Sequence, residues 1–124
     1  GVAFIVDDMD NSATDITTLN FHGVGTGGTA EAAANTALVT ESTTALNPDS
    51  TRATGTKTQP SANILRSVGT VTFDGSAAIT EHGIFSQAAT GGGTLLDRSL
   101  FSAINVAAAD SIQFTYDLTF TSGG

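Results

Sequence analysis

The segment Ile112-Gln113-Phe114-Thr115-Tyr116-Asp117-Leu118-Thr119-Phe120 alternates strictly between large apolar and polar side chains. A period of two places the two sets on opposite faces of a β-strand, so one face is buried and the other faces water. Half-buried strands are typical of antiparallel sheets, because the strands of parallel sheets are covered on both faces. The segment therefore predicts an antiparallel, all-β protein with a core that includes Ile112, Phe114, Tyr116, Leu118 and Phe120.

Other segments repeat the strand pattern between turn signals about ten residues apart. Strands are predicted at 19–24, 64–73, 78–85 and 94–106, with shorter candidates at 2–6 and 51–58. Segment 64–73 is apolar on both faces, so we expect it to be central in its sheet. Asp74-Gly75 is a hairpin signal and predicts that the strands on either side of it pair. Phe73 and Phe85 complete the predicted core. This spacing is typical of a β-sandwich or jelly roll.

Residues 29–40 are the exception to the strand pattern. Thr29 is a suitable N-cap, and Glu31 with the following alanines favours a helix. The apolar stripe is weak, so we expect at most one short helix or helical turn within 29–40.

Length and composition indicate one domain. The chain has 124 residues, and we expect 1–124 to form a single β-sandwich domain in which 1–18 is an extended arm or an edge strand. There is no cysteine, which excludes disulfides and thiolate chemistry. The longest apolar run, Val2–Val6, is far shorter than the roughly 20 residues of a membrane-spanning helix. We therefore expect no membrane partner.

The chain is acidic and carries few charges. Its formal net charge is −8, and its four basic residues, Arg52, Lys57, Arg66 and Arg98, are scattered. Isolated cations cannot follow a phosphate backbone, so we expect no nucleic-acid partner. Charged residues make up 13 % of the chain, about half the usual share. The exposed edges of its sheets therefore lack the charged side chains that normally prevent pairing with other chains. We expect much of the surface to be covered by partners.

Gly23-Val24-Gly25-Thr26-Gly27-Gly28 matches G-x-G-x-x-G, the dinucleotide-binding pattern. The preceding segment contains Asn20 and His22, which do not suit a buried parallel strand. No repeating βα units follow. We therefore expect a flexible glycine turn and no cofactor.

An acidic segment has part of a calcium-loop pattern. Asp8, Asp10 and Ser12 have the required spacing, but Ala13 and Leu19 stand where a glycine and a glutamate belong. Four carboxylates lie in this region: Asp7, Asp8, Asp10 and Asp15. We expect a solvated acidic loop and no metal site.

His22 and His82 are the only histidines. No G-x-S-x-G or H-E-x-x-H pattern accompanies them, so we expect surface or interface histidines and no catalytic residues. Glu81 and His82 are adjacent in a predicted strand, so their side chains point to opposite faces.

Two arginines also lie in predicted strands. Asp97 and Arg98 are adjacent and should point to opposite faces. We expect Arg66 and Arg98 each to meet a carboxylate across the sheet, such as Glu81 or Asp117, in pairs that fix register or an interface.

Several segments, in order along the chain, resemble a known group of proteins. They are the glycine turn at 23–27, Asn35-Thr36-Ala37-Leu38-Val39-Thr40-Glu41, Ile79-Thr80-Glu81-His82-Gly83-Ile84-Phe85, Thr94-Leu95-Leu96-Asp97-Arg98, Asp110-Ser111-Ile112-Gln113-Phe114-Thr115-Tyr116 and Leu118-Thr119. Together, over about residues 20 to 122, they resemble small β-sandwich structural proteins of tailed bacteriophages. This group includes capsid decoration (cement) proteins and some tail or baseplate components.

The resemblance implies a virion protein that decorates and stabilises the assembled capsid, without enzyme activity or cofactor. Its partners would be the major capsid protein and copies of itself, as a homo-oligomer on the capsid surface made in the cytoplasm of a bacterial host. Val2, Phe4, Ile5 and Val6 are the predicted assembly interface, because an apolar segment can add as a strand to a neighbouring chain. A tail or baseplate protein is one alternative. A carbohydrate-binding module is another, although the chain has no Trp and Tyr116 is its only Tyr.

Overall fold

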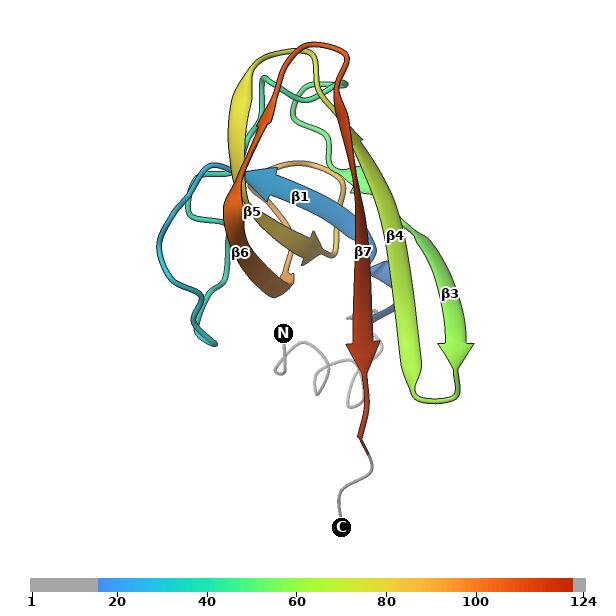
Figure 1. Ribbon diagram of the computed structural model, residues 1–124. Helices are drawn as coiled ribbons and strands as arrows, with labels where there is room; N and C mark the ends of the chain where they lie inside the picture. Colours follow the sequence, from blue (N-terminus) through green and yellow to red (C-terminus); the bar gives the residue numbers. More distant parts are fainter. Residues whose placement is uncertain (1–15, 122–124) are drawn as a thin grey trace.

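The computed structural model describes residues 16–121, and for Ile16 it describes only the backbone. Its elements are η1 (Ile16–Thr18), β1 (Phe21–Gly25), β2 (Ala53–Thr54), β3 (Thr56–Ser61), β4 (Ile64–Thr72), β5 (Ala77–Phe85), β6 (Leu95–Val106) and β7 (Ser111–Thr119) (Figure 1). They form a four-stranded sheet, β2-β1-β5-β6, and a three-stranded sheet, β3-β4-β7, in which every pair is antiparallel. The predicted all-β sandwich is confirmed, and β4 is central in its sheet as predicted.

The two sheets share one long antiparallel ribbon that is folded across the core. Its first strand is β4 followed by β5, and its second is β6 followed by β7; both connections cross between the sheets at the top of Figure 1. Four residues on each strand, 73–76 and 107–110, separate the pair Thr72↔Ser111 from the pair Ala77↔Val106. Because the two crossings are equally long, the register passes unchanged from one sheet into the other.

The predicted hairpin at Asp74-Gly75 is wrong. β4 pairs with β3 and β7, whereas β5 pairs with β1 and β6. The amide of Phe73 donates to Asp110 O (2.8 Å) and the amide of Asp74 donates to Ala45 O (2.9 Å). The long-range partners of this crossing therefore satisfy the backbone groups that a tight turn would have paired locally.

The core lies beneath this crossing, between the sheets. Its largest buried cluster consists of Val24, Leu46, Val71, Phe73, Ile79 and Val106. Ile112 and Phe114 pack against this cluster, and Phe85 belongs to a second one with Leu38 and Leu95.

The other end of the sandwich is less well covered. Tyr116 and Leu118 are only half-buried there. Phe120 is 56 % exposed, so its assignment to the core is wrong. It follows the last paired residue of β7, Thr119, where the opposite sheet does not extend far enough to cover it.

Residues 29–40 form no helix, so the prediction of a short helix is wrong, and they contain one hydrogen-bonded turn, from Asn35 N to Ala32 O (3.0 Å). Isolated helices this short are marginal in water, and here backbone groups of the segment form hydrogen bonds with residues outside it. The amide of Thr26 donates to Thr40 O (3.0 Å), which closes the segment into a loop beside β1. Within residues 16–121, no helix is long and apolar enough to cross a membrane.

The position of the core can be tested with two phenylalanines. Phe73→Ala should lower the free energy of unfolding by roughly 3–5 kcal/mol, because it opens a cavity at a side chain that is 1 % exposed. Phe120→Ala is the matched control and should change the free energy of unfolding far less. Urea denaturation of both variants checks this. Equal losses would contradict the described core.

Candidate functional site

The most deeply buried ion pair of the described residues joins β5 and β6. Arg98 Nε donates to Glu81 Oε1 at 2.8 Å, and both side chains are at most 1 % exposed. The expectation that Arg98 meets Glu81 across the sheet is confirmed. An ion pair this deep needs further hydrogen bonds, because its mutual attraction alone does not offset the loss of hydration.

The loop of residues 26–41 supplies those hydrogen bonds. The backbone amides of Gly27, Val39 and Thr40 each donate to the Glu81 carboxylate at 2.8 Å. Arg98 Nη2 donates to the carbonyl of Thr29 at 2.8 Å. The pair therefore holds both ends of a loop that has no helix or strand of its own.

These bonds set the protonation state of Glu81. Burial alone would raise the pKa of its carboxyl group. The hydrogen bonds from Arg98 and from the amides of Thr40, Val39 and Gly27 outweigh burial and lower that pKa. The carboxylate is therefore held in its charged form, as an anchor with no proton to donate.

Two glycines of the G-x-G-x-x-G pattern, Gly25 and Gly27, serve this anchor. Gly23 and Gly25 lie within β1 rather than in a flexible turn. A Cβ on Gly25 or on Gly27 would overlap the carboxylate of Glu81. The pattern thus reflects close approach of the backbone to a buried side chain, and the helix that a dinucleotide site requires is absent from residues 29–40.

A second ion pair fixes the adjacent loops. Arg52 binds Glu41 through two hydrogen bonds, Nε–Oε2 at 2.7 Å and Nη2–Oε1 at 2.8 Å. Its guanidinium lies 3.5 Å from the ring centroid of Phe85 and also donates to the carbonyls of Gln87 and Gly92. Arg52 therefore joins the loop that follows Glu41 to the β5–β6 loop.

A third ion pair is exposed. Arg66 on β4 binds Asp117 on β7 at 2.8 Å, as predicted, with side chains 39 % and 35 % exposed. The hydrogen bond between them raises the pKa of Arg66 and lowers the pKa of Asp117. Exposed pairs contribute little to stability, so this pair serves as a reference for the buried ones.

The two histidines lie between the sheets in a chain of hydrogen bonds. His22 Nδ1 is 2.9 Å from His82 Nε2, and His22 Nε2 is 2.8 Å from Ser67 Oγ. His82 stacks on Phe114 of the opposite sheet, with ring centroids 4.2 Å apart. His22 is 0 % and His82 6 % exposed, so the prediction of surface or interface histidines is wrong.

Glu81 and His82 point to opposite faces, as predicted. Glu81 contacts Arg98 and the 26–41 loop, whereas His82 contacts His22 and Phe114. The buried carboxylate therefore takes no part in the histidine chain.

The direction of the histidine chain follows from its far end. Asn20 Nδ2 donates to Gly55 O, so Asn20 Oδ1 is the acceptor for the Ser67 hydroxyl, at 2.8 Å. Ser67 Oγ must then accept a hydrogen bond from His22 Nε2–H, and His22 Nδ1 accepts one from His82 Nε2–H. In this arrangement His22 donates to Ser67 and cannot act as its base.

Burial keeps both imidazoles neutral. Desolvation lowers the pKa of His22 to about 4. Desolvation, with a smaller contribution from the charge of His22, lowers the pKa of His82 to about 3. The chain therefore requires both rings without charge, which makes it sensitive to acid.

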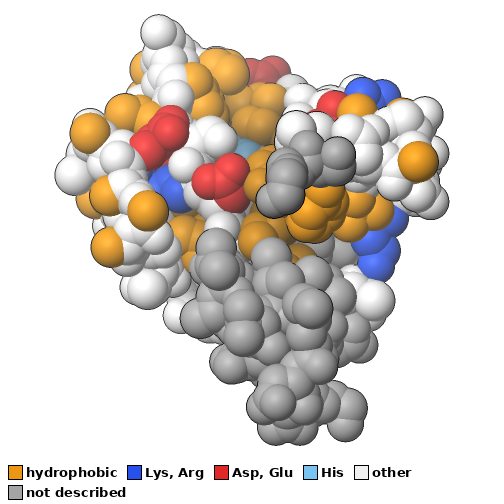
Figure 2. All heavy atoms as spheres, turned by 90° about the horizontal axis from the view of Figure 1, so that it is seen from below, with side chains coloured by type: hydrophobic (Ala, Val, Ile, Leu, Met, Phe, Trp, Pro, Cys, Tyr) orange, Lys and Arg blue, Asp and Glu red, His pale blue; other side chains and the backbone are white. Residues whose placement is uncertain are grey.

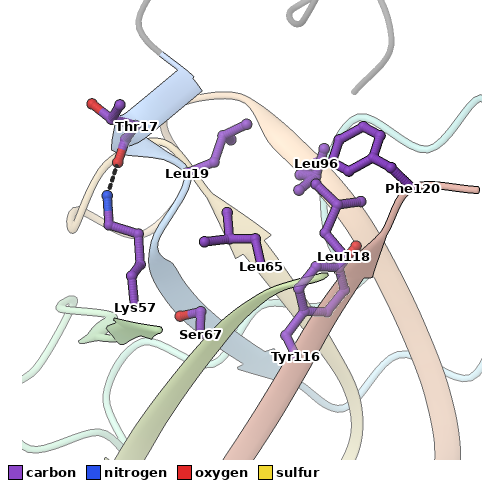
Figure 3. Close-up of a pocket in the computed structure, with 9 residues that line it drawn as sticks. All are labelled: Thr17, Leu19, Lys57, Leu65, Ser67, Leu96, Tyr116, Leu118 and Phe120. Atoms are coloured by element: carbon purple, nitrogen blue, oxygen red, sulfur yellow. Dashed lines mark hydrogen bonds between the residues drawn. The ribbon is translucent and has the colours of Figure 1, made fainter. Parts of the chain in front are cut away.

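An apolar groove of about 300 Å³ opens at the end of the sandwich away from the crossings. Side chains from both sheets and from residues 17–19 point into it (Figure 3), and hydrophobic atoms gather on this face in the view from below (Figure 2). It is lined by Thr17, Leu19, Lys57, Leu65, Ser67, Leu96, Tyr116, Leu118 and Phe120. Burial, then the charge of Asp97 and a 3.1 Å hydrogen bond to it, raise the pKa of the Tyr116 hydroxyl.

Two sets of predicted residues lie outside the described residues: the assembly segment Val2, Phe4, Ile5 and Val6, and the acidic residues Asp7, Asp8, Asp10 and Asp15. Among residues that the structure describes, no three His, Cys, Asp or Glu side chains are grouped to hold a metal ion.

Sequence reasoning missed the histidine chain and the groove. The glycines that follow the histidines, Gly23 and Gly83, are no signal for the histidine chain, because each lies against Phe85 on the other face of the sheet. Gly69 on β4 does face His22, and a Cβ there would overlap the imidazole. No local signal marks the groove, because distant segments converge to form it.

The histidine chain predicts loss of stability in acid. In the unfolded state the two histidines bind protons near pH 6.5, whereas in the folded state they do so only near pH 4 and pH 3. Their contribution to the free energy of unfolding is therefore fully present above pH 6.5 and is lost as the pH falls. Between pH 7 and pH 5 the free energy of unfolding should fall by roughly 4 kcal/mol for the two histidines together. Urea denaturation across this range tests it.

His82→Gln is the matched variant, because its amide can still donate to His22 but does not titrate near neutral pH. It should lose about half of that pH dependence. An unfolding free energy of the unaltered protein that stays constant from pH 7 to pH 5 would contradict the buried, neutral pair.

The buried ion pair predicts a large difference between two conservative changes. Glu81→Gln should lower the free energy of unfolding by roughly 3 kcal/mol or more, because it leaves the Arg98 charge buried without a partner. Asp117→Asn, at the exposed pair, should leave the denaturation midpoint nearly unchanged. Similar midpoints for the two variants would refute the anchoring role of Glu81.

Comparisons of the chain with models of known protein families, with curated protein sequences and with solved structures found no match.

Proposed function

We propose that this chain is a structural virion protein that decorates and stabilises a bacteriophage capsid by binding the assembled shell. The resemblance of its segments to small phage structural proteins supports this proposal. The structural observation that carries it is the apolar groove at the open end of the sandwich. Leu65 and Phe120 in its lining are 40 % and 56 % exposed, and apolar surface of this kind favours contact with another protein.

The buried charges of the described residues favour a binding role over catalysis. Glu81 is bound by Arg98 and three loop amides, and Glu41 is bound by Arg52 and one loop amide. His22 and His82 bond to each other. These groups stabilise loops and the interface between the sheets, which suits a rigid protein that presents a fixed surface.

The net charge suits docking onto a more basic shell. A chain with a net charge of −8 would be attracted to such a shell, and salt screens this attraction. Binding should therefore weaken as ionic strength rises. A decoration protein of this kind binds the assembled shell and not its free subunits, and many copies then stabilise the shell by mass action.

The test is the number of copies of this chain in each purified virion, by quantitative peptide mass spectrometry against the major capsid protein. We expect a number comparable with that of the capsid protein. A number far below it would replace decoration by a tail or baseplate role. Absence from the virion would refute the structural role.

A further inference from the structure

The groove lies where the edges of the two sheets separate. Among the described residues, β6 pairs with no strand except β5, and β7 with none except β4, so each has one edge without a partner strand, although on β6 the amide of Leu100 donates to Glu31 Oε1. Leu96 from β6 and Leu118 from β7 line the groove between these edges. An added strand could therefore pair with a free edge while its apolar side chains enter the groove.

The chain contains a segment that fits this site. Val2–Val6 is uncharged, and five residues in extended form cover about 16 Å. Nine residues, 7–15, connect it to Ile16 and reach at most about 30 Å. Thr17 and Leu19, next along the chain, already line the groove, so the segment is tethered at its rim.

The charge of the connection favours a neighbour's groove over the chain's own. Asp7, Asp8, Asp10 and Asp15 place four carboxylates within nine residues. Charged linkers repel themselves and extend, which disfavours the tight reversal that would return the segment to its own groove. Lys57 stands at each groove and holds the carbonyl of Thr17 of the same chain, so its ammonium offers a cation to the aspartates of either copy.

From this placement we infer that the groove between β6 and β7 accepts the segment Val2–Val6 of a second copy of this chain. The inference deepens the proposed function and rests on it for its purpose, since it names a contact by which copies assemble. Exchange of identical segments between copies is a low-cost route to an oligomer.

The absence of cysteine permits a direct test with the purified full chain. Phe4→Cys chains are mixed with Phe120→Cys chains, or in a second mixture with Leu65→Cys chains, under mild oxidation. Both acceptor positions line the groove and are exposed, which limits damage to the fold. Ile104→Cys on β6 is the matched control, because Ile104 is 42 % exposed but does not line the groove.

We expect disulfide-linked heterodimers in both groove mixtures, several-fold above the Ile104→Cys control. Heterodimers no more frequent than in the control would overturn the inference. A chain that carries both Phe4→Cys and Phe120→Cys tests the alternative occupant, which is the chain's own Val2–Val6 segment. If it closes only an internal disulfide while the mixtures do not cross-link, the segment occupies its own groove and the inference is wrong. Because no virion is used, either result leaves the copy-number test of the proposed function independent.

Discussion

Glu81 brings a negative charge to a position that is 0 % exposed, and much of the structure depends on how that charge is satisfied. Arg98 neutralises it and three loop amides complete its hydrogen bonds. The loop 26–41 is thereby fixed against the four-stranded sheet. Glu41 at the end of this loop is then in place to bind Arg52, which holds the β5–β6 loop in turn. A single buried carboxylate thus organises most of the irregular chain.

The folded ribbon gives the molecule two unlike ends. At the crossings, Phe73 is 1 % exposed and the register continues between the sheets. At the other end the strands of the two sheets diverge, and Phe120 and Leu65 remain exposed around the groove. The closed end stabilises the fold, and the open end supplies the apolar surface on which the proposed assembly depends.

Periodicity in the sequence predicted the sheets well, because the alternation in β7 reflects which face is covered. It could not predict that Phe120 is exposed, since alternation identifies a face but not how far the opposite sheet extends. The Asp74-Gly75 hairpin and the helix at 29–40 failed for a related reason. Both predictions rest on local preferences, and here partners distant in sequence, Asp110 and Glu81, bind the backbone instead. The pairing of Arg98 with Glu81 was predictable because it requires only strand geometry.

Native-state hydrogen exchange of the amides of Gly27, Val39 and Thr40 tests the central claim most directly. None of these three residues lies in a strand or helix, yet each amide donates to Glu81. We predict that they exchange as slowly as the paired amides of β5 and β6, because releasing them requires breaking the buried ion pair. Exchange as fast as that of the other amides in residues 26–41 would contradict the claim that this carboxylate holds the loop.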